Sequence, residues 1–384
     1  MVHQLWVFGS NGEGQLGEGI PVADIVDKPT LLPYQSWFRD IKAIKSGDNH
    51  TLFQLKDGSV FGIGDDRVAQ LGAGPMQGDP LDVISQVTQF RKLESNAVLC
   101  AASCTTSAFV SYNEGPRSSL FTHGHGQWGE LGRGDLVLAS TIDLSELPWM
   151  DTYLSGEVID FAAGVWHYIV VMADGSVYGW GKARLGQLGA GLRDKVNEPT
   201  KIEDIPFKPV KAICGKDFTY LVSDPLTGEH ILLGKDKFNI VSNMPPDIKG
   251  WKDIGATWNA IFVLFDDGRL TAWGKENQWK LLPPDLPAID TIAVGSDHIL
   301  AVTKDEKIIS WGWGKHGNCG DISAIKHELK NDLISGFWNE ISISGKIQNI
   351  FAGYCTSFVI TEVVEDEAKP KGASKLEMGA EEEP

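Results

Sequence analysis

The stretch Gly164-Val165-Trp166-His167, the apolar run Tyr168–Val171 and the segment Ser176–Gly181 decide the fold of this chain. The same arrangement recurs seven times: a small residue, two variable residues and a polar or bulky residue lead into an apolar strand, a turn and a second strand ending in glycine. A repeat of roughly 40–60 residues built from short hairpins is typical of a β-propeller rather than a helical solenoid. The copies begin at Gly47, Ala102, Gly164, Gly215, Ala256, Gly295 and Gly353, and their fourth residues are His50, Thr105, His167, Phe218, Asn259, His298 and Thr356.

The two ends of the chain each carry half of a repeat. Leu5–Gly9 reads as a second strand with no first strand before it, and Phe351–Thr361 supplies a first strand with no second strand after it. Pairing the two would close the ring and satisfy two exposed strand edges at once. The sequence therefore predicts an all-β, seven-bladed β-propeller over residues 1–361, closed by pairing of its N- and C-terminal strands. Residues 362–384, rich in glutamate and poor in apolar residues, are expected to form a disordered acidic tail.

Composition narrows the class of protein. The chain has 384 residues, a formal net charge of −17 and five cysteines without paired zinc-ligand spacing. Reduced thiols and the absence of a long apolar run at Met1–Gly19 favour a cytoplasmic and nuclear protein that neither enters nor binds a membrane. A strongly acidic surface repels polyanions, so direct binding of nucleic acid is not expected.

Hairpin geometry predicts which rim of the propeller binds a partner. In an antiparallel pair, the start of the first strand and the end of the second lie at the same end. The residues before each first strand and the loops after each second strand, which often read Gln-Leu-Gly, therefore share one rim. Asp-Gly turns, such as Asp174-Gly175, occupy the other.

Tryptophans concentrate at the first of these rims. Trp166 and Trp258 precede the recurring fourth residue, and the loops of the same rim carry Trp128, Trp279, Trp313 and His316. Two interpretations remain open: the indoles cap the core between blades, or they anchor a bound protein. The residues predicted to bind a partner are Trp258, Trp166, Trp279, Trp313, His316, Asn318 and Cys319.

No catalytic or cofactor site is expected. Gly12-x-Gly14-x-x-Gly17 imitates a dinucleotide fingerprint, but no helix follows it and the repeat itself explains the glycines. His123-Gly124-His125 offers two metal ligands without an evident third. His50, His167 and His298 are best explained as structural residues that fix the start of a strand. We therefore expect a protein without catalytic residues, metal or cofactor.

The repeat phrases resemble the regulator of chromosome condensation family: Gly-x-x-His leading into a strand, then Trp-Gly, then Gly-Gln-Leu-Gly. The resemblance covers nearly all of residues 1–361. A narrower resemblance, to the alpha-tubulin suppressor or killer-toxin-insensitivity group, rests on Ile309–Gly320 together with Phe8–Gly12. This chain departs from that group in its longer tail and longer insertions.

The narrower resemblance implies a heterodimer with a small CSL-type zinc or iron protein. Through that partner it implies support of diphthamide synthesis on elongation factor two and of Elongator-dependent wobble-uridine modification of tRNA. His316 and Cys319 would then lie near the partner's metal or support their own loop. The broader resemblance leaves two alternatives: a guanine-nucleotide exchange factor for a small nuclear GTPase, or a substrate-recognition module for ubiquitin transfer.

Overall fold

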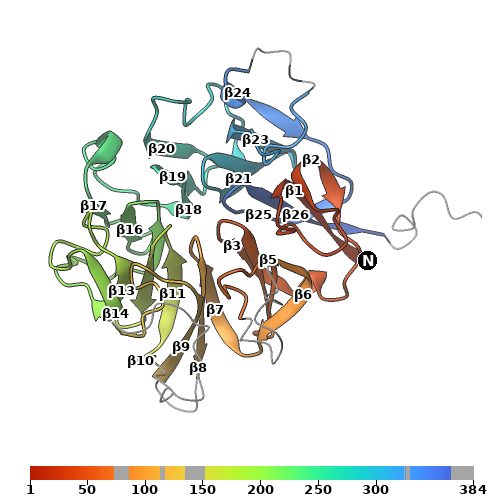
Figure 1. Ribbon diagram of the computed structural model, residues 1–384. Coiled ribbons are helices and arrows are strands. Elements are labelled where there is room, and N and C mark those ends of the chain that lie inside the picture. The colour runs from red at the N-terminus through yellow and green to blue at the C-terminus, as the bar shows by residue number, and fades with distance from the viewer. Residues whose placement is uncertain (73–85, 113–116, 135–151, 324, 326–328, 365–384) are drawn as a thin grey trace, which may run out of the picture.

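The N- and C-terminal strands pair and close the ring, as predicted. Strand β1 (Val2–Asn11) runs antiparallel to β26 (Thr356–Val363), from Val2 opposite Val363 to Gly9 opposite Thr356. The computed structural model describes residues 1–72, 86–112, 117–134, 152–323, 325 and 329–364. In this part of the chain, seven small sheets surround a central axis (Figure 1). The predicted acidic tail lies almost entirely outside the described residues.

Each blade is an antiparallel sheet whose strands we letter A to D from the axis outward. Blades one, two, three and six have four strands in chain order, and blade seven has the order β25, β26, β1, β2. Blades four and five have three. The four-stranded blades one to three are β3 (Ile41–Ser46), β4 (His50–Leu55), β5 (Val60–Asp65) and β6 (Gln86–Glu94); β7 (Ala97–Ala102), β8 (Thr106–Tyr112), β9 (Arg117–Gly124) and β10 (Thr152–Ser155); and β11 (Val158–Ala163), β12 (His167–Met172), β13 (Val177–Lys182) and β14 (Lys195–Lys201).

The remaining strands complete the ring. Short 3-10 turns lie at η1 (Phe38–Asp40) and η2 (Lys237–Asn239). The strands of blades four to seven are β15 (Lys211–Cys214), β16 (Phe218–Val222) and β17 (His230–Gly234); β18 (Trp251–Ala256), β19 (Ala260–Phe265) and β20 (Leu270–Gly274); β21 (Ile289–Val294), β22 (His298–Thr303), β23 (Ile308–Trp313) and β24 (Leu333–Ile341); and β25 (Lys346–Ala352), β26, β1 and β2 (Ala23–Leu31).

The two strands expected in each repeat are B and C, and both form. Strand A, next to the axis, was missed because its apolar residues stand three apart, as in Ile41 and Ile44. A register shift between Ile41 and Ala43 explains this spacing, because a bulge inserts one residue and turns both isoleucines to the same side. The same buried-exposed-intermediate pattern recurs in β11, β18 and β21.

The three recurring histidines join neighbouring blades. The ring of His167 packs against Gly164, where an added Cβ would lie 2.3 Å from its Cε1 atom. Its Nε2 lies 3.0 Å from the hydroxyl of Thr219 in the next blade, and that hydroxyl donates to the carbonyl of Gln187 at 2.8 Å. Because the hydroxyl proton is already used, Nε2–H of the imidazole must be the donor. Burial lowers the pKa of His167 to about 3, so the ring is neutral and structural, as expected.

The loops after strand C are stabilised by a recurring amide. The side-chain oxygens of Gln15, Gln70 and Gln187 accept a backbone N–H two residues earlier, at 2.9–3.1 Å. Glu130 takes the same place, and its Oε2 accepts the N–H of Trp128 at 2.8 Å. Its Oε1 is buried without a hydrogen-bond partner among the described residues, and burial raises the pKa of this carboxyl to about 7. A carboxyl group therefore stands where the repeat normally places a neutral amide.

Glu130→Gln is expected to stabilise the protein at neutral and higher pH. The folded carboxyl stays protonated up to about pH 7, whereas the unfolded one ionises near 4.5. The wild type thus loses stability as pH rises between these values, and the variant does not. Urea unfolding should show a gain of roughly 2–3 kcal/mol at pH 8 and a much smaller one at pH 5. An equal gain at both pH values would contradict a titrating Glu130.

No helix in the described ranges is long and apolar enough to cross a membrane.

Candidate protein-binding site

The loops between strands A and B (AB loops) and those after strand C (CD loops) lie on one rim, as the hairpin geometry predicted. Backbone hydrogen bonds join them: the N–H groups of Lys182, Lys275 and Trp313 donate to the carbonyls of Trp166, Asn259 and Asp297 at 2.8–2.9 Å. The turns between strands B and C lie on the opposite rim. We call the first surface the AB rim.

The repeats align differently from the sequence prediction in blades two and five. In blade three, the N–H of Gly164 donates to the carbonyl of His167. The corresponding bonds in blades two and five run from Ser103 to Thr106 and from Thr257 to Ala260. The repeats there start one residue later than predicted from Ala102 and Ala256. Trp258 therefore does not occupy the position of Trp166 but the one before it.

This shift places Trp258 in a ring of residues around the mouth of the central channel. Backbone N–H groups of Asp48, Cys104, Lys216 and Trp258 each donate to the AB loop of the next blade, at 2.8–3.2 Å. The indole of Trp258 meets the Tyr354 ring edge-on, with centroids 5.6 Å apart. The ring positions are Asp48, Cys104, Val165, Lys216, Trp258, Ser296 and Tyr354.

A groove opens on the AB rim beside Trp258, across blades four to six. It consists of two adjoining hollows of about 650 and 290 Å³ that share Lys237, Phe238, Trp258 and Asn259. Trp313 lines its far side. The CD loops of blades four and five, which depart from Gln-Leu-Gly, leave room for this groove. Half-buried aromatic side chains in a hollow of this size are typical of anchor points in protein interfaces.

Lysines surround the aromatic rings of the groove. The ammonium of Lys216 lies 5.3 Å from the centroid of the Trp258 ring. Those of Lys237 and Lys275 lie 5.2 and 5.3 Å from the centroid of Phe238. Contacts of this kind hold the lysine stems and rings together while the charge stays available to a ligand.

Phe238 occupies this place in a strained backbone conformation. Its φ of 62° and ψ of 27° lie in the left-handed region, which a bulky residue adopts at a cost of about 1–3 kcal/mol. Sequence reasoning missed this residue. The available signal was the departure of Lys235–Ile240 from the Gln-Leu-Gly pattern, with one aromatic residue at its centre.

Four of the seven predicted partner-binding residues are half-buried on the AB rim. Trp258 and Trp313 line the groove, and His316 packs edge-on against Trp313 with ring centroids 5.0 Å apart. Burial, followed by the nearby Lys315, lowers the pKa of His316. Trp166 lies in blade three, outside the residues that line the groove. The structure thus brings together three of these four.

The other three predicted contacts are corrected by their burial. Trp279 is 4% exposed because it stacks on Phe262 in the core between blades five and six. Asn318 is 2% exposed and donates to the carbonyl of Trp313 at 2.9 Å. Cys319 is fully buried, and burial raises its thiol pKa to about 12. All three support the rim from below, and Trp279 also lines the larger hollow of the groove. The Cys319 side chain lies inside the CD loop of blade six.

Two half-buried carboxylates, Asp297 and Asp217, also line the groove. Burial raises the pKa of Asp297 to about 6, against the opposing effect of Lys275 and Lys216. Asp217 pairs with Lys182 at 3.5 Å and with Lys237 at 3.9 Å. None of the described residues that line the groove is a serine, cysteine or histidine. The lining consists of aromatic and aliphatic side chains, lysines, aspartates and amides.

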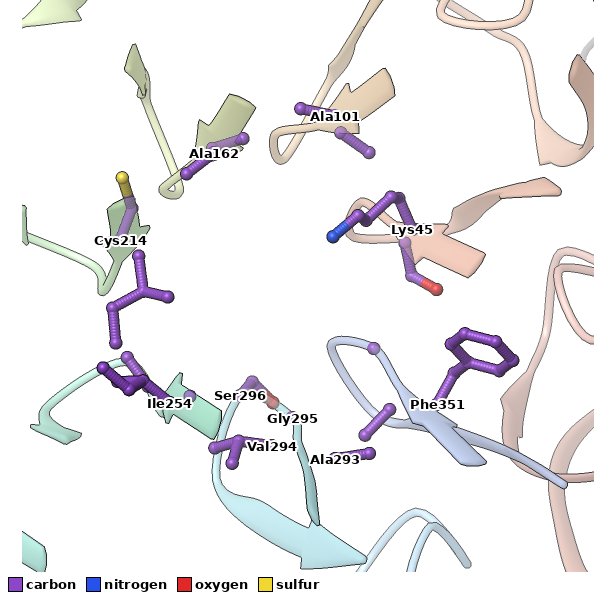
Figure 2. A pocket seen from close by; sticks show the side chains of 18 of the residues that line it. Lys45, Ala101, Ala162, Cys214, Ile254, Ala293, Val294, Gly295, Ser296 and Phe351 are labelled. Atoms are coloured by element: carbon purple, nitrogen blue, oxygen red, sulfur yellow. The ribbon is translucent and has the colours of Figure 1, made fainter. Parts of the chain in front are cut away.

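The central channel forms a separate hollow, of about 430 Å³. Figure 2 shows the amine of Lys45 projecting into it among small side chains such as Ala101, Ala162 and Ser296. Within the described part of the chain, no cluster of three or more histidine, cysteine, aspartate or glutamate residues could hold a metal ion. The channel shares Trp258 with the AB-rim groove, whose lining in addition includes Phe238 and Trp313.

Comparison with known families finds the same repeat. Models of the regulator of chromosome condensation (RCC1) repeat match residues 3–54 and 174–222, and a second model of that repeat matches 158–187 and 289–318. An RCC1 repeat-containing protein of Schizosaccharomyces pombe is 27% identical over 92% of this chain and 98% of its own length.

Other relatives differ in length and in named activity. The secretion-regulating guanine nucleotide exchange factor of Mus musculus is 25% identical over 83% of this chain and 75% of its own. The ultraviolet-B receptor of Arabidopsis thaliana is 31% identical over 56% of this chain; the match covers only 46% of the receptor.

Two solved structures share the architecture. Human WBSCR16 superposes with a TM-score of 0.73 at 17% identity, over 94% of this chain and all of that one. Prp20p of Saccharomyces cerevisiae superposes with a TM-score of 0.74 at 17% identity, over 96% and 93% of the two chains. At this identity the likeness concerns the fold.

Proposed function

We propose that this chain, which belongs to the RCC1-repeat family, is a non-enzymatic propeller that binds a smaller protein on its AB rim. The observation that carries this proposal is the groove beside Trp258. Half-buried Trp258, Phe238 and Trp313 line it, lysines flank its rings, and strained Phe238 is held in place there. Aromatic anchors surrounded by charged residues are the arrangement that protein interfaces use for affinity and orientation.

The partner we propose is a small CSL-type zinc or iron protein bound as a heterodimer. The complex would support diphthamide synthesis on elongation factor two and Elongator-dependent wobble-uridine modification of tRNA. Support comes from the resemblance of Ile309–Gly320, which ends strand C of blade six and forms its CD loop. That segment delivers Trp313 and His316 to the AB rim, next to the groove.

A second candidate is a guanine-nucleotide exchange factor. It is favoured by the 25% identity, over most of both chains, to the mouse secretion-regulating exchange factor. Acidic groups on the AB rim, such as Asp217 and Asp297, would suit such a role. A third, substrate recognition for ubiquitin transfer, draws on a 26% match to mouse HERC2, a ubiquitin ligase of which the match covers only 7%.

Two assays on the purified full chain separate the first two candidates. Mixed with the CSL-type protein, the chain should co-elute with it at the summed mass of a heterodimer. Added to a small nuclear GTPase loaded with fluorescent nucleotide, it should leave the release rate unchanged. Accelerated release would replace the proposal by the exchange-factor function, and failure to co-elute would remove the CSL-type partner.

A further inference from the structure

Within the part of the chain that the structure describes, blades four and five lack the outer strand that every other blade has. Their sheets are β15-β16-β17 and β18-β19-β20, so β20 is the outermost strand of blade five (Figure 1). The connections that follow strand C in these blades contain Pro245-Pro246 and Pro283-Pro284. Proline has no N–H for a ladder, which explains why neither connection forms a regular strand D.

The free edge of β20 presents unpaired backbone groups. The N–H of Phe265 donates to the carbonyl of Arg269, and that of Lys275 to the carbonyl of Asn259, both at 2.9 Å. In this register the odd-numbered residues bond to β19, and Leu270, Ala272 and Gly274 direct N–H and C=O outward. In blades three and six, the residues equivalent to Ala272 pair with strand D, as Gly179 with Thr200 and Ser310 with Asn339. Beside β20, none of the described residues takes that place.

A buried donor without an acceptor lies on the same strand. Trp273 is 6% exposed, and its Nε1–H has no hydrogen-bond partner among the described residues. The equivalent indoles are satisfied: Trp180 donates to the carbonyl of Glu130 and Trp311 to that of Leu281, both at 2.8 Å. Those acceptors belong to the CD loop of the preceding blade, and in blade four that loop departs from the common pattern. The Thr271 hydroxyl is also buried, and no described residue forms a hydrogen bond with it.

Both residues line a groove of about 280 Å³ between β20 and the connection that precedes blade five. The charged residues that line this groove are the cations Arg269 and Lys249 and the carboxylate Asp247. The guanidinium of Arg269 lies 3.9 Å from the centroid of the Phe265 ring, and its contact with Asp267 at 3.8 Å is exposed. On a chain with a net charge of −17, this groove is locally cationic.

We propose that β20 takes up, as its missing fourth strand, an extended segment of another protein with acidic or amide side chains at alternate positions. The segment's backbone would pair with Leu270, Ala272 and Gly274. Residues across from Thr271 and Trp273 would sit in non-hydrogen-bonded pairs, where side chains are closest. A side-chain acceptor at these two positions would reach the Thr271 hydroxyl and the Trp273 indole N–H. A carboxylate across from Arg269, two residues along the strand, would pair with its guanidinium. Strand addition with alternate side-chain pockets is a recurring mode of peptide recognition.

The probe for this proposal is a nine-residue peptide selected from a randomised displayed library against the full chain and then synthesised. We expect selected peptides to carry Asp, Glu, Asn or Gln at every second position. Trp273→Phe, which keeps an aromatic ring but removes the N–H together with part of the indole, should weaken peptide binding about tenfold. Ala272→Pro removes an outward N–H without breaking a bond to β19, and should abolish binding. Trp258→Ala on the AB rim is the matched control and should leave peptide affinity unchanged.

Amide hydrogen exchange completes the test. Bound peptide should slow amide exchange at Leu270 and Ala272 at least tenfold. Each variant should be as fully folded as the wild type. Failure to select any peptide, or selected peptides insensitive to Ala272→Pro, would overturn the proposal. So would self-association of the chain that Ala272→Pro abolishes, because a second copy would then occupy the edge. Loss of peptide binding in Trp258→Ala would likewise overturn it and place the peptide on the AB rim.

Discussion

Trp258→Ala is expected to weaken binding of the CSL-type partner by about 30- to 700-fold, because truncation of a central aromatic anchor typically costs 2–4 kcal/mol. Trp258 lies where the groove meets the mouth of the channel and contacts both Tyr354 and Lys216. Removing its indole deletes the apolar floor of the groove and frees the Lys216 ammonium. Affinity measured by calorimetry with the full chain would show the loss.

The matched control for this variant lies on the opposite rim. Leu226, in the turn between β16 and β17, is 89% exposed, and Leu226→Ala should change partner affinity by less than twofold. Both variants should keep the thermal unfolding temperature of the wild type within a few degrees. Equal affinities of the Trp258 and Leu226 variants would place the interface elsewhere.

Gly181→Ala is expected to destabilise the propeller by at least about 4 kcal/mol. Losses of this size are measured for substitutions that disrupt backbone geometry or core packing. Gly181 ends strand C of blade three with a φ of +100°, where an added Cβ would lie 2.4 Å from the carbonyl oxygen of Trp166. That carbonyl accepts the N–H of Lys182, the bond that joins the AB and CD loops. The methyl group therefore meets backbone that holds the rim together.

Gly191→Ala provides the comparison, since an added Cβ at that position meets no atom of the described residues within 4 Å. Urea unfolding followed by tryptophan fluorescence should give the Gly191 variant the midpoint of the wild type. The Gly181 variant should unfold at a far lower urea concentration. Coincident unfolding curves would show that the close approach at the end of strand C is not required.

The fold was predictable because its signals are local and repeated. Tight Asp-Gly turns and glycines that end strand C recur in register, and the half repeats at the termini require each other. The A strands were not found, because a bulge places Ile41 and Ile44 three residues apart and hides the alternation expected of a strand. Periodicity cannot distinguish that spacing from a helical turn.

For the candidate site, the sequence predicted the rim on which it lies but only some of the residues that line it. The repeat of blade five could begin at either Ala256 or Thr257, because both residues are small. A start at Ala256 aligns Trp258 with Trp166, whereas the hydrogen bonds start the repeat at Thr257. Trp279 reads as a loop residue, yet the irregular connection carries it into the core against Phe262. The position of the Phe238 side chain depends on its left-handed backbone conformation, which the sequence does not predict.

Hydrogen exchange on the complex of the full chain with the CSL-type protein tests the central claim most directly. If the partner binds on the AB rim, exchange should slow in peptides that cover 235–240, 256–260 and 275–279. The turns at 224–228 and 266–268 on the opposite rim should exchange as in the free chain. Protection confined to those turns, with residues 256–260 unaffected, would contradict the account.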